Sequence, residues 1–153
     1  MKKLRVISSA LVVLFIAVGA VTAQNGGSRG VTPEDYLSFE FASDPNISPD
    51  GKLVAYVVTK IDRAQNRRNS SIWMAATDGS RAPWQFTTAP QSSNSPRWSP
   101  DGKAVAFLSS RPTETAMSTE QPRSQVYILS MNGGEASRLT NLKNGVSSFR
   151  WSP

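Results

Sequence analysis

Short apolar runs separated by Gly-containing turns dominate the pattern of the chain. The runs cover residues 53–58, 72–76, 104–108 and 126–131. The first and third runs lack clean alternation, which is typical of strands buried on both faces. Asp78-Gly79 and Asn132-Gly133 follow the second and fourth runs, and such dipeptides turn a chain into a further strand. The pattern therefore predicts two similar units, each built from four short strands.

A motif that occurs three times organises these units. Ser-Pro-Asp-Gly-Lys begins at Ser48 and again at Ser99, and a third copy begins with Trp151-Ser152-Pro153. The three serines lie 51 and then 53 residues apart. A period near fifty residues, with four short strands per period, indicates propeller blades. The predicted fold is all-β, a partial β-propeller. Two similar hairpins in an unrelated β-sandwich are the alternative.

Each Pro-Asp-Gly-Lys segment has the chemistry of a tight turn. Proline restricts φ, aspartate bonds to the nearby backbone, and glycine accepts positive φ. We therefore expect Gly51 and Gly102 to adopt positive φ in equivalent turns. Asp50, Asp78 and Asp101 each precede a glycine without the spacing of a calcium-binding loop, so they are interpreted as turn residues.

The segment ahead of the first repeat predicts a linker and a short helix. Residues 24–30 are rich in glycine. Thr32 can cap a helix that has Pro33 at its first position and Asp35 in its first turn, and the helix is expected to end near Ser38 or Glu40. The expected division is a linker and helix over 24–44 and an incomplete propeller over 45–153. Within the propeller, blade one covers about 45–90, blade two about 91–144, and residues 145–153 start blade three.

The N-terminus has the order of a secretory signal peptide. A basic start is followed by an apolar run over residues 6–20 and by small residues before Gln24, so residues 1–23 are predicted to be cleaved. A retained anchor is the alternative. The expected location is periplasmic or secreted, with membrane contact only through the signal peptide before cleavage.

The net charge also depends on this segment. It is +6 for the full chain, and removal of Lys2, Lys3 and Arg5 leaves +3. A nucleic-acid partner is therefore not expected.

Composition excludes several chemistries. The chain has no Cys and no His, so it can form neither a Ser-His-Asp triad nor a thiolate or imidazole metal site. The string from Gly26 to Gly30 matches G-x-S-x-G, but a real nucleophile elbow lies between a strand and a helix, and this one lies in a linker. No catalytic, cofactor-binding or metal-binding residue is predicted, and no cofactor.

Several basic and aromatic residues could bind a ligand, but most of them have a structural interpretation. Four basic residues are interpreted as belonging to a solvated loop between two strands: Lys60, Arg63, Arg67 and Arg68. Trp98 and Trp151 occupy equivalent repeat positions and are expected to pack between blades. Trp84 has no aromatic counterpart, so its role stays open. The polar segment 110–124 is expected to be a loop.

The repeats resemble those of TolB-like proteins and of the propeller of prolyl oligopeptidase-family serine peptidases. Residues 33–37 and 44–52 are similar to the start of the acylaminoacyl-peptidase-like or dipeptidyl-peptidase-like branch, and residues 96–103 and 133–140 to its blade joints. The likeness covers about residues 32–153 and favours the peptidase branch because of the segment ahead of blade one.

The resemblance implies a parent enzyme that hydrolyses short peptides, with the propeller limiting substrate access. Its triad would lie in a C-terminal α/β-hydrolase domain, and no catalytic residue transfers to this chain. The expected partners are that missing domain, the remaining blades and a peptide substrate. A TolB-like periplasmic propeller that only binds proteins is the alternative. The sequence after Pro153 would discriminate them.

Overall fold

The structure, a computed structural model, describes residues 29–88, 91–112 and 122–152. The residues from Val31 onward form one compact unit. The expected signal peptide and most of the G-x-S-x-G string lie outside the described residues. No helix in the described part of the chain is long and apolar enough to cross a membrane.

Helix α1 (Pro33–Tyr36) is a single turn held by a capping box. The Thr32 backbone N–H donates to the Asp35 carboxylate at 2.8 Å, and the Asp35 N–H donates to the Thr32 hydroxyl at 3.4 Å. The helix stops at Tyr36 with Leu37 as its C-cap, earlier than the expected end near Ser38 or Glu40. It stops there because the chain joins a β-sheet at Glu40.

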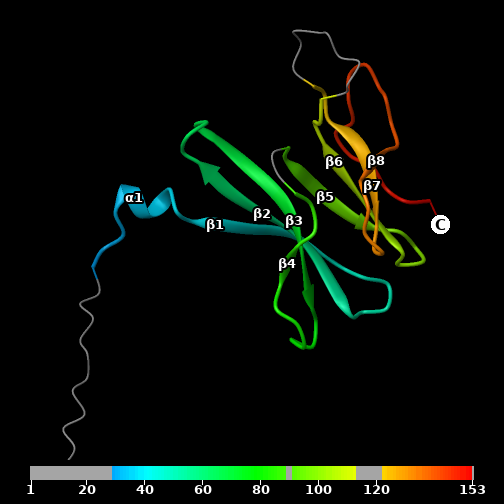
Figure 1. Ribbon diagram of the computed structural model, residues 1–153, viewed down its shortest axis with the longest axis horizontal. Helices are drawn as coiled ribbons and strands as arrows, with labels where there is room; N and C mark the ends of the chain where they lie inside the picture. The colour runs from blue at the N-terminus through cyan, green and yellow to red at the C-terminus, as the bar shows by residue number, and fades with distance from the viewer. Residues whose placement is uncertain (1–28, 89–90, 113–121, 153) are drawn as a thin grey trace, which may run out of the picture. The chain divides into compact units, whose positions relative to one another are not determined.

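In the described part of the chain, eight strands form two four-stranded antiparallel sheets, each in chain order (Figure 1). The first sheet contains β1 (Glu40–Ile47), β2 (Leu53–Asp62), β3 (Arg67–Ala76) and β4 (Trp84–Gln85). The second contains β5 (Ser93–Trp98), β6 (Ala104–Ser109), β7 (Gln125–Ser130) and β8 (Ser137–Arg138). The two sheets confirm the predicted pair of four-stranded repeats.

Two expected boundaries differ from the structure. The first strand starts at Glu40, so the boundary drawn at residue 45 falls inside a strand. Strands β2 and β3 also pair as far as Asp62 and Arg67, which shortens the expected loop to residues 63–66. These strands are longer than expected because each pairs with a neighbouring strand. Hydrogen bonds between strands satisfy the backbone N–H and C=O groups of a residue whatever its side chain.

The predicted turn geometry is confirmed. Gly51 has φ of 73° and Gly102 has φ of 69°. In both turns the glycine N–H donates to the carbonyl of the motif serine, Ser48 or Ser99, at 2.9 Å. The two copies of the motif therefore make the same turn between the first and second strands of their blades.

Replacing Gly102 with valine should lower the free energy of unfolding by about 1–3 kcal/mol, because a β-branched residue is strained at positive φ. Space is not the cause, since an added Cβ would lie an ordinary 3.6 Å from Pro49. Urea unfolding should show the loss. Gly30→Val is the control, because an added Cβ there has no atom of the described residues within 4 Å. An unchanged midpoint for Gly102→Val would contradict the strain.

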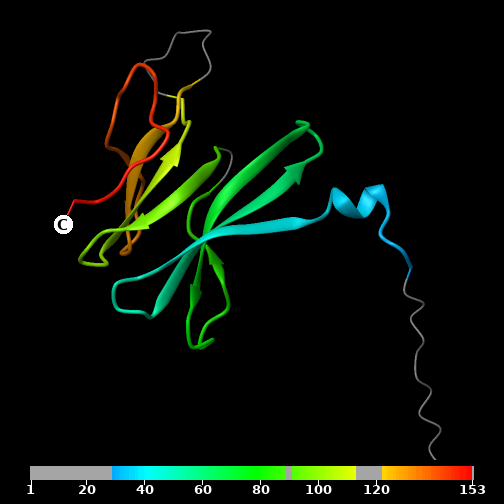
Figure 2. The ribbon, with the colours of Figure 1, turned by 180° about the vertical axis from the view of Figure 1, so that it is seen from behind.

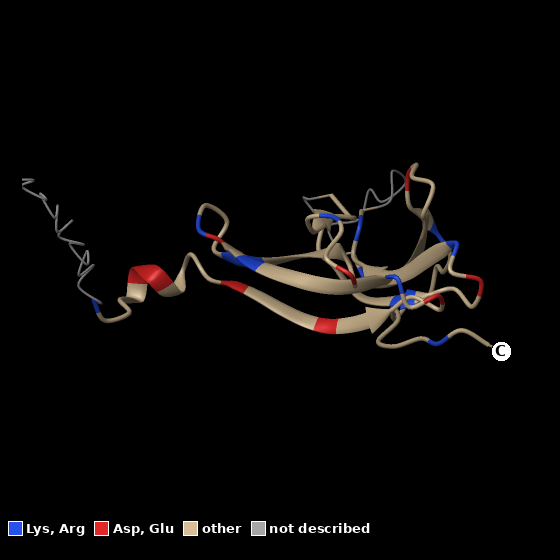
Figure 3. Cartoon of the chain, turned by 90° about the horizontal axis from the view of Figure 1, so that it is seen from below, with Lys and Arg blue, Asp and Glu red and all other residues tan. Residues whose placement is uncertain are grey.

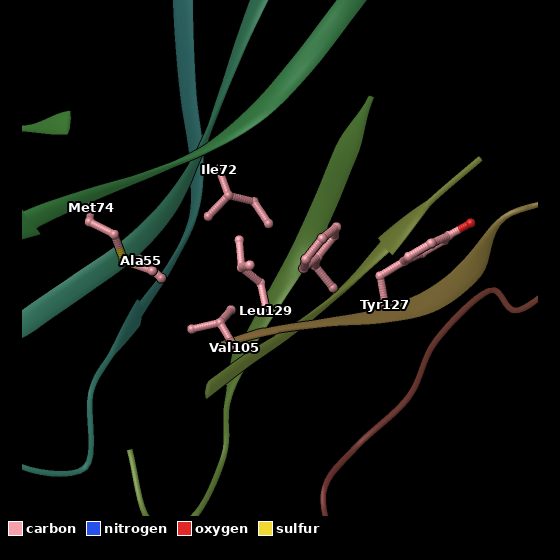
Figure 4. Close-up of a cluster of buried hydrophobic side chains, with 7 residues drawn as sticks. Ala55, Ile72, Met74, Val105, Tyr127 and Leu129 are labelled. Atoms are coloured by element: carbon pink, nitrogen blue, oxygen red, sulfur yellow. The ribbon is translucent and has the colours of Figure 1, made fainter. Parts of the chain in front are cut away.

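The main core lies between the two sheets. Ala55, Ile72 and Met74 of the first sheet meet a cluster from the second sheet (Figure 4). The second-sheet members are Val105, Phe107, Tyr127 and Leu129. Ala55, Ile72, Met74, Val105 and Phe107 have no exposed surface. Burial of this apolar surface holds the two blades together.

The second sheet is buried on its other face too. Ala106, Leu108 and Val126 form a smaller cluster there, against which Phe149 and Trp151 pack. A β-sandwich covers one face of each sheet, whereas a propeller blade has a neighbour on both. Because the start of the third repeat covers this far face, the blade arrangement applies and the sandwich alternative does not.

Candidate functional site

The inner edge of the fold is formed by β1 and β5. Strand β5 contacts β1 as well as β2 and β3, whereas no contact joins β4 to β8 within the described residues. The sheets therefore diverge from the β1–β5 edge (Figures 1 and 2). In a propeller, four-stranded sheets diverge in this way from a central channel. The β1–β5 edge is thus the part of this chain that a complete propeller would turn toward its channel.

Both inner strands carry the same backbone irregularity. The register shifts between Ser43 and Asn46 in β1 and between Asn94 and Arg97 in β5. Inside each shift a non-glycine residue before a proline takes positive φ, 48° at Asp44 and 54° at Ser95. Such conformations are uncommon and bend the strand. Because the bend occurs at the equivalent position of both blades, it is a regular feature of the blade.

An ion pair links the two inner strands at these bends. Arg97 Nη1 donates to both carboxylate oxygens of Asp44, at 3.1 and 3.0 Å, and to the Pro96 carbonyl at 2.7 Å. Both side chains keep 36% of their surface exposed. Solvent screening keeps the energy of such a pair modest, so its main effect is to align β5 against β1.

Tryptophan side chains repeat a second link between blades. Trp98 Nε1–H donates to the Asn46 carbonyl at 3.0 Å, and Trp151 Nε1–H donates to the Arg97 carbonyl at 3.1 Å. Asn46 and Arg97 occupy equivalent repeat positions, 51 residues apart. The predicted packing of both tryptophans between blades is confirmed. These residues line a hollow of about 560 Å³ beside the joint.

The motif aspartates serve the turns. The Ser48 hydroxyl donates to Asp50 at 2.6 Å, and the Lys52 N–H donates to the same oxygen at 3.1 Å. Ser99, Asp101 and Lys103 repeat both distances. These hydrogen bonds, the serine bond first, lower the pKa of both aspartates. Within the described residues no cluster of acidic side chains could hold a metal ion.

Ser48→Ala should raise the pKa of Asp50 toward its ordinary 3.8, because the largest cause of the lowering is removed. A lowered carboxyl pKa stabilises the fold above pH 3.8, and this contribution is lost as the pH falls through the lowered value. The variant should therefore show a weaker pH dependence in that acid range. NMR titration of the Asp50 carboxyl measures the shift. Asp101 is the internal control, and a parallel change there would contradict a local cause.

Two curated relatives of this chain are named as peptidases. "Uncharacterized peptidase YuxL" of Bacillus subtilis is 38% identical over 124 residues, which cover 80% of this chain and 17% of that protein. "Dipeptidyl-peptidase 5" of Porphyromonas gingivalis is 31% identical over 105 residues, 67% of this chain and 15% of that protein. No family model matches the chain.

A solved structure shows the fold. Pyrococcus horikoshii acylaminoacyl peptidase aligns with a TM-score of 0.52 at 23% identity, over 71% of this chain and 15% of that one. The two sheets of this chain therefore match the propeller blades of prolyl oligopeptidase-type peptidases. The chain spans only 17% and 15% of the length of the two curated relatives.

The basic residues of this propeller segment have structural roles. Lys60 lies in β2 and pairs with Glu40 at 2.7 Å. Arg63 donates to the Glu34 carbonyl at 2.9 Å, and Arg68 donates to the Tyr36 hydroxyl at 3.0 Å. Of the four, only Arg63 lies in the turn, so the expected loop placement was wrong for the others. Lys and Arg are spread among acidic residues in this view of the chain (Figure 3).

Trp84, the segment 110–124 and the serines are the other candidates that the sequence offered. Trp84, whose role was open, lies in β4, packs against the main core and carries Arg81 at 4.0 Å from its ring. Of the expected loop 110–124, residues 113–121 lie outside the described residues. Since the chain contains no His, no serine in it has the base that peptide hydrolysis by a triad requires.

Sequence reasoning missed the contacts that depend on pairing register. The Arg97–Asp44 link and the positive φ at Asp44 and Ser95 were not predicted. A cation stacked over an aromatic ring, present in each blade, was also missed. Superposing the two repeats at an offset of 51 residues would have found the last feature, because both cations follow an aromatic residue by four positions.

Proposed function

We propose that this chain forms the first blades of the propeller of an exported serine peptidase that hydrolyses short peptides. The observation that carries the proposal is the 38% identity with a peptidase over 80% of the chain. The Ser, Asp and His of that enzyme would lie in a C-terminal α/β-hydrolase domain, outside the residues of this chain. The other partners would be the remaining blades and a peptide substrate.

The role proposed for the blades is to limit which substrates reach the catalytic site. The β1–β5 edge supports it, because the Arg97–Asp44 pair and the Trp98–Asn46 bond join the two inner strands. A channel wall tied in this way resists widening. It would admit short, flexible peptides and exclude folded proteins by size.

Export is proposed from the N-terminal pattern, with a periplasmic or secreted location. Mass spectrometry of the exported protein should find Gln24, or its cyclised form, as the first residue after cleavage behind Ala23. A mature chain that still begins at Met1 would instead favour a retained anchor.

The reading frame beyond Pro153 tests the peptidase proposal directly. We expect further Ser-Pro-Asp-Gly blades, then a G-x-S-x-G motif between a strand and a helix, then Asp and His in that order. Further blades followed by a stop codon, without a hydrolase domain, would overturn the proposal in favour of a TolB-like protein-binding propeller.

A further inference from the structure

Each blade places a cation over an aromatic ring at the same position. In blade one Lys60 Nζ lies 5.6 Å from the centre of the Trp73 ring. In blade two the Arg111 guanidinium lies 5.1 Å from the Tyr127 ring centre and 5.6 Å from that of Phe107. Register shows the equivalence, because Trp73 pairs with Tyr56 and Tyr127 pairs with Phe107. The aromatic faces attract both cations and fix their position.

The two cations differ in their anionic partner. Lys60 forms an ion pair with Glu40, its partner across the strands, at 2.7 Å. The position 51 residues after Glu40 is Gln91, an uncharged amide. Arg111 Nε is buried and has no hydrogen-bond partner among the described residues. Blade two therefore keeps the cation but lacks the acid that accompanies it in blade one.

Arg111 faces a cavity between the two blades. The cavity has a volume of about 350 Å³ and is lined on the apolar side by Phe86 and Leu129. Small-molecule sites begin at about this size. Glu135 also lines it, but this side chain is exposed and makes no ion pair with Arg111 among the described residues. Arg111 lines this cavity, and its Nε–H has no acceptor among the described residues, so a cavity of this size beside a cationic donor suits a small anion.

Thr87 adds a second unused donor to the same cavity. It is 2% exposed, and its hydroxyl oxygen accepts the Ile72 N–H at 2.9 Å. In blade two the equivalent Thr140 accepts the Val126 N–H and also donates its proton to Gln125 at 2.8 Å. Ser71 replaces that glutamine in blade one, so the Thr87 proton has no acceptor among the described residues.

We propose that this cavity is a carboxylate-binding site in which Arg111 and the Thr87 hydroxyl hold the carboxylate of a short peptide or small organic acid. A guanidinium beside a hydroxyl matches the planar acceptor geometry of a carboxylate. The cavity walls contributed by Phe86 and Leu129 would contact the rest of the ligand. The proposal does not depend on the peptidase activity, because both donors belong to this chain and the site lies between blades.

NMR titration of the full chain tests the site. The probes are N-acetyl-Ala-Ala with a free carboxylate, the same dipeptide as its amide, and acetate. We expect the Arg111 Nε–H signal to shift with the free dipeptide and not with the amide. Affinity for acetate at least tenfold weaker would assign the site to peptide C-termini, and equal affinity would assign it to small acids. No shift with either carboxylate, or an equal shift with the amide, would overturn the proposal.

Two variants and a control separate recognition from folding. Arg111→Lys retains the charge but loses the planar donor, and Gln91→Glu supplies the acid that accompanies Lys60 in blade one. Each should weaken dipeptide binding at least tenfold, as followed by the amide signals of Leu129 and Gly134. Lys60→Gln changes the matching cation of blade one and should leave affinity unchanged. If Arg111→Lys does not fold, Gln91→Glu decides, and unchanged affinity in that variant would overturn the proposal.

Discussion

Replacing Phe107 with alanine should lower the free energy of unfolding of this chain by about 3–5 kcal/mol, the usual cost of truncating a fully buried aromatic side chain. Phe107 has no exposed surface and belongs to the cluster shared by both sheets. Its ring stacks on Tyr127 with centres 6.1 Å apart. The cavity left behind would therefore weaken both the blade itself and the contact between blades.

Urea unfolding at low micromolar concentration, followed by tryptophan fluorescence, measures this loss. Leu142→Ala is the matched control, because Leu142 is 57% exposed and surface truncations usually change stability by less than about 0.5 kcal/mol. A loss below about 1 kcal/mol for Phe107→Ala would show that the two sheets do not share a core in solution.

An active-site serine probe should label a longer protein that includes the proposed hydrolase domain and leave residues 24–153 unlabelled. The reason is chemical. A serine nucleophile at neutral pH needs a base within hydrogen-bond reach to accept its proton. The chain has no His, and Ser28, in its elbow-like string, lies in a predicted linker. We likewise expect the longer protein to hydrolyse short peptides and residues 24–153 alone not to hydrolyse them.

Two controls sharpen this experiment. Substitution of the serine in the downstream G-x-S-x-G should abolish labelling of the longer protein, whereas Ser28→Ala should leave it unchanged. Labelling of residues 24–153 alone would show that a nucleophile exists within this chain. Absence of labelling in a longer protein that ends after its blades would support the TolB-like alternative.

The blade repeat was predictable from sequence because its determinants are local. The Ser-Pro-Asp-Gly turn closes through hydrogen bonds within five residues, such as those of Ser48 and Asp50. Positive φ at Gly51 and Gly102 follows from the same few residues. A period near fifty then predicts blades, because one four-stranded unit cannot bury both faces alone.

Boundaries were less predictable because they depend on partners far along the chain. Glu40 joins a strand because it pairs with Lys60, and Arg67 joins a strand because it pairs with Asp62. Neither residue is a strong strand former. Local sequence thus placed the turns well and the strand ends poorly.

The sequence by itself determined the repeat, the turns, the absence of a triad and the likeness to peptidase propellers. Only the tertiary structure decided that Arg97 reaches Asp44, that Trp98 and Trp151 each bond to the preceding blade, and that Arg111 and Thr87 line one cavity. The physical reason is the distance along the chain over which each interaction acts. Turn and strand signals act over a few residues, whereas these contacts join groups from different blades and depend on how the sheets pack.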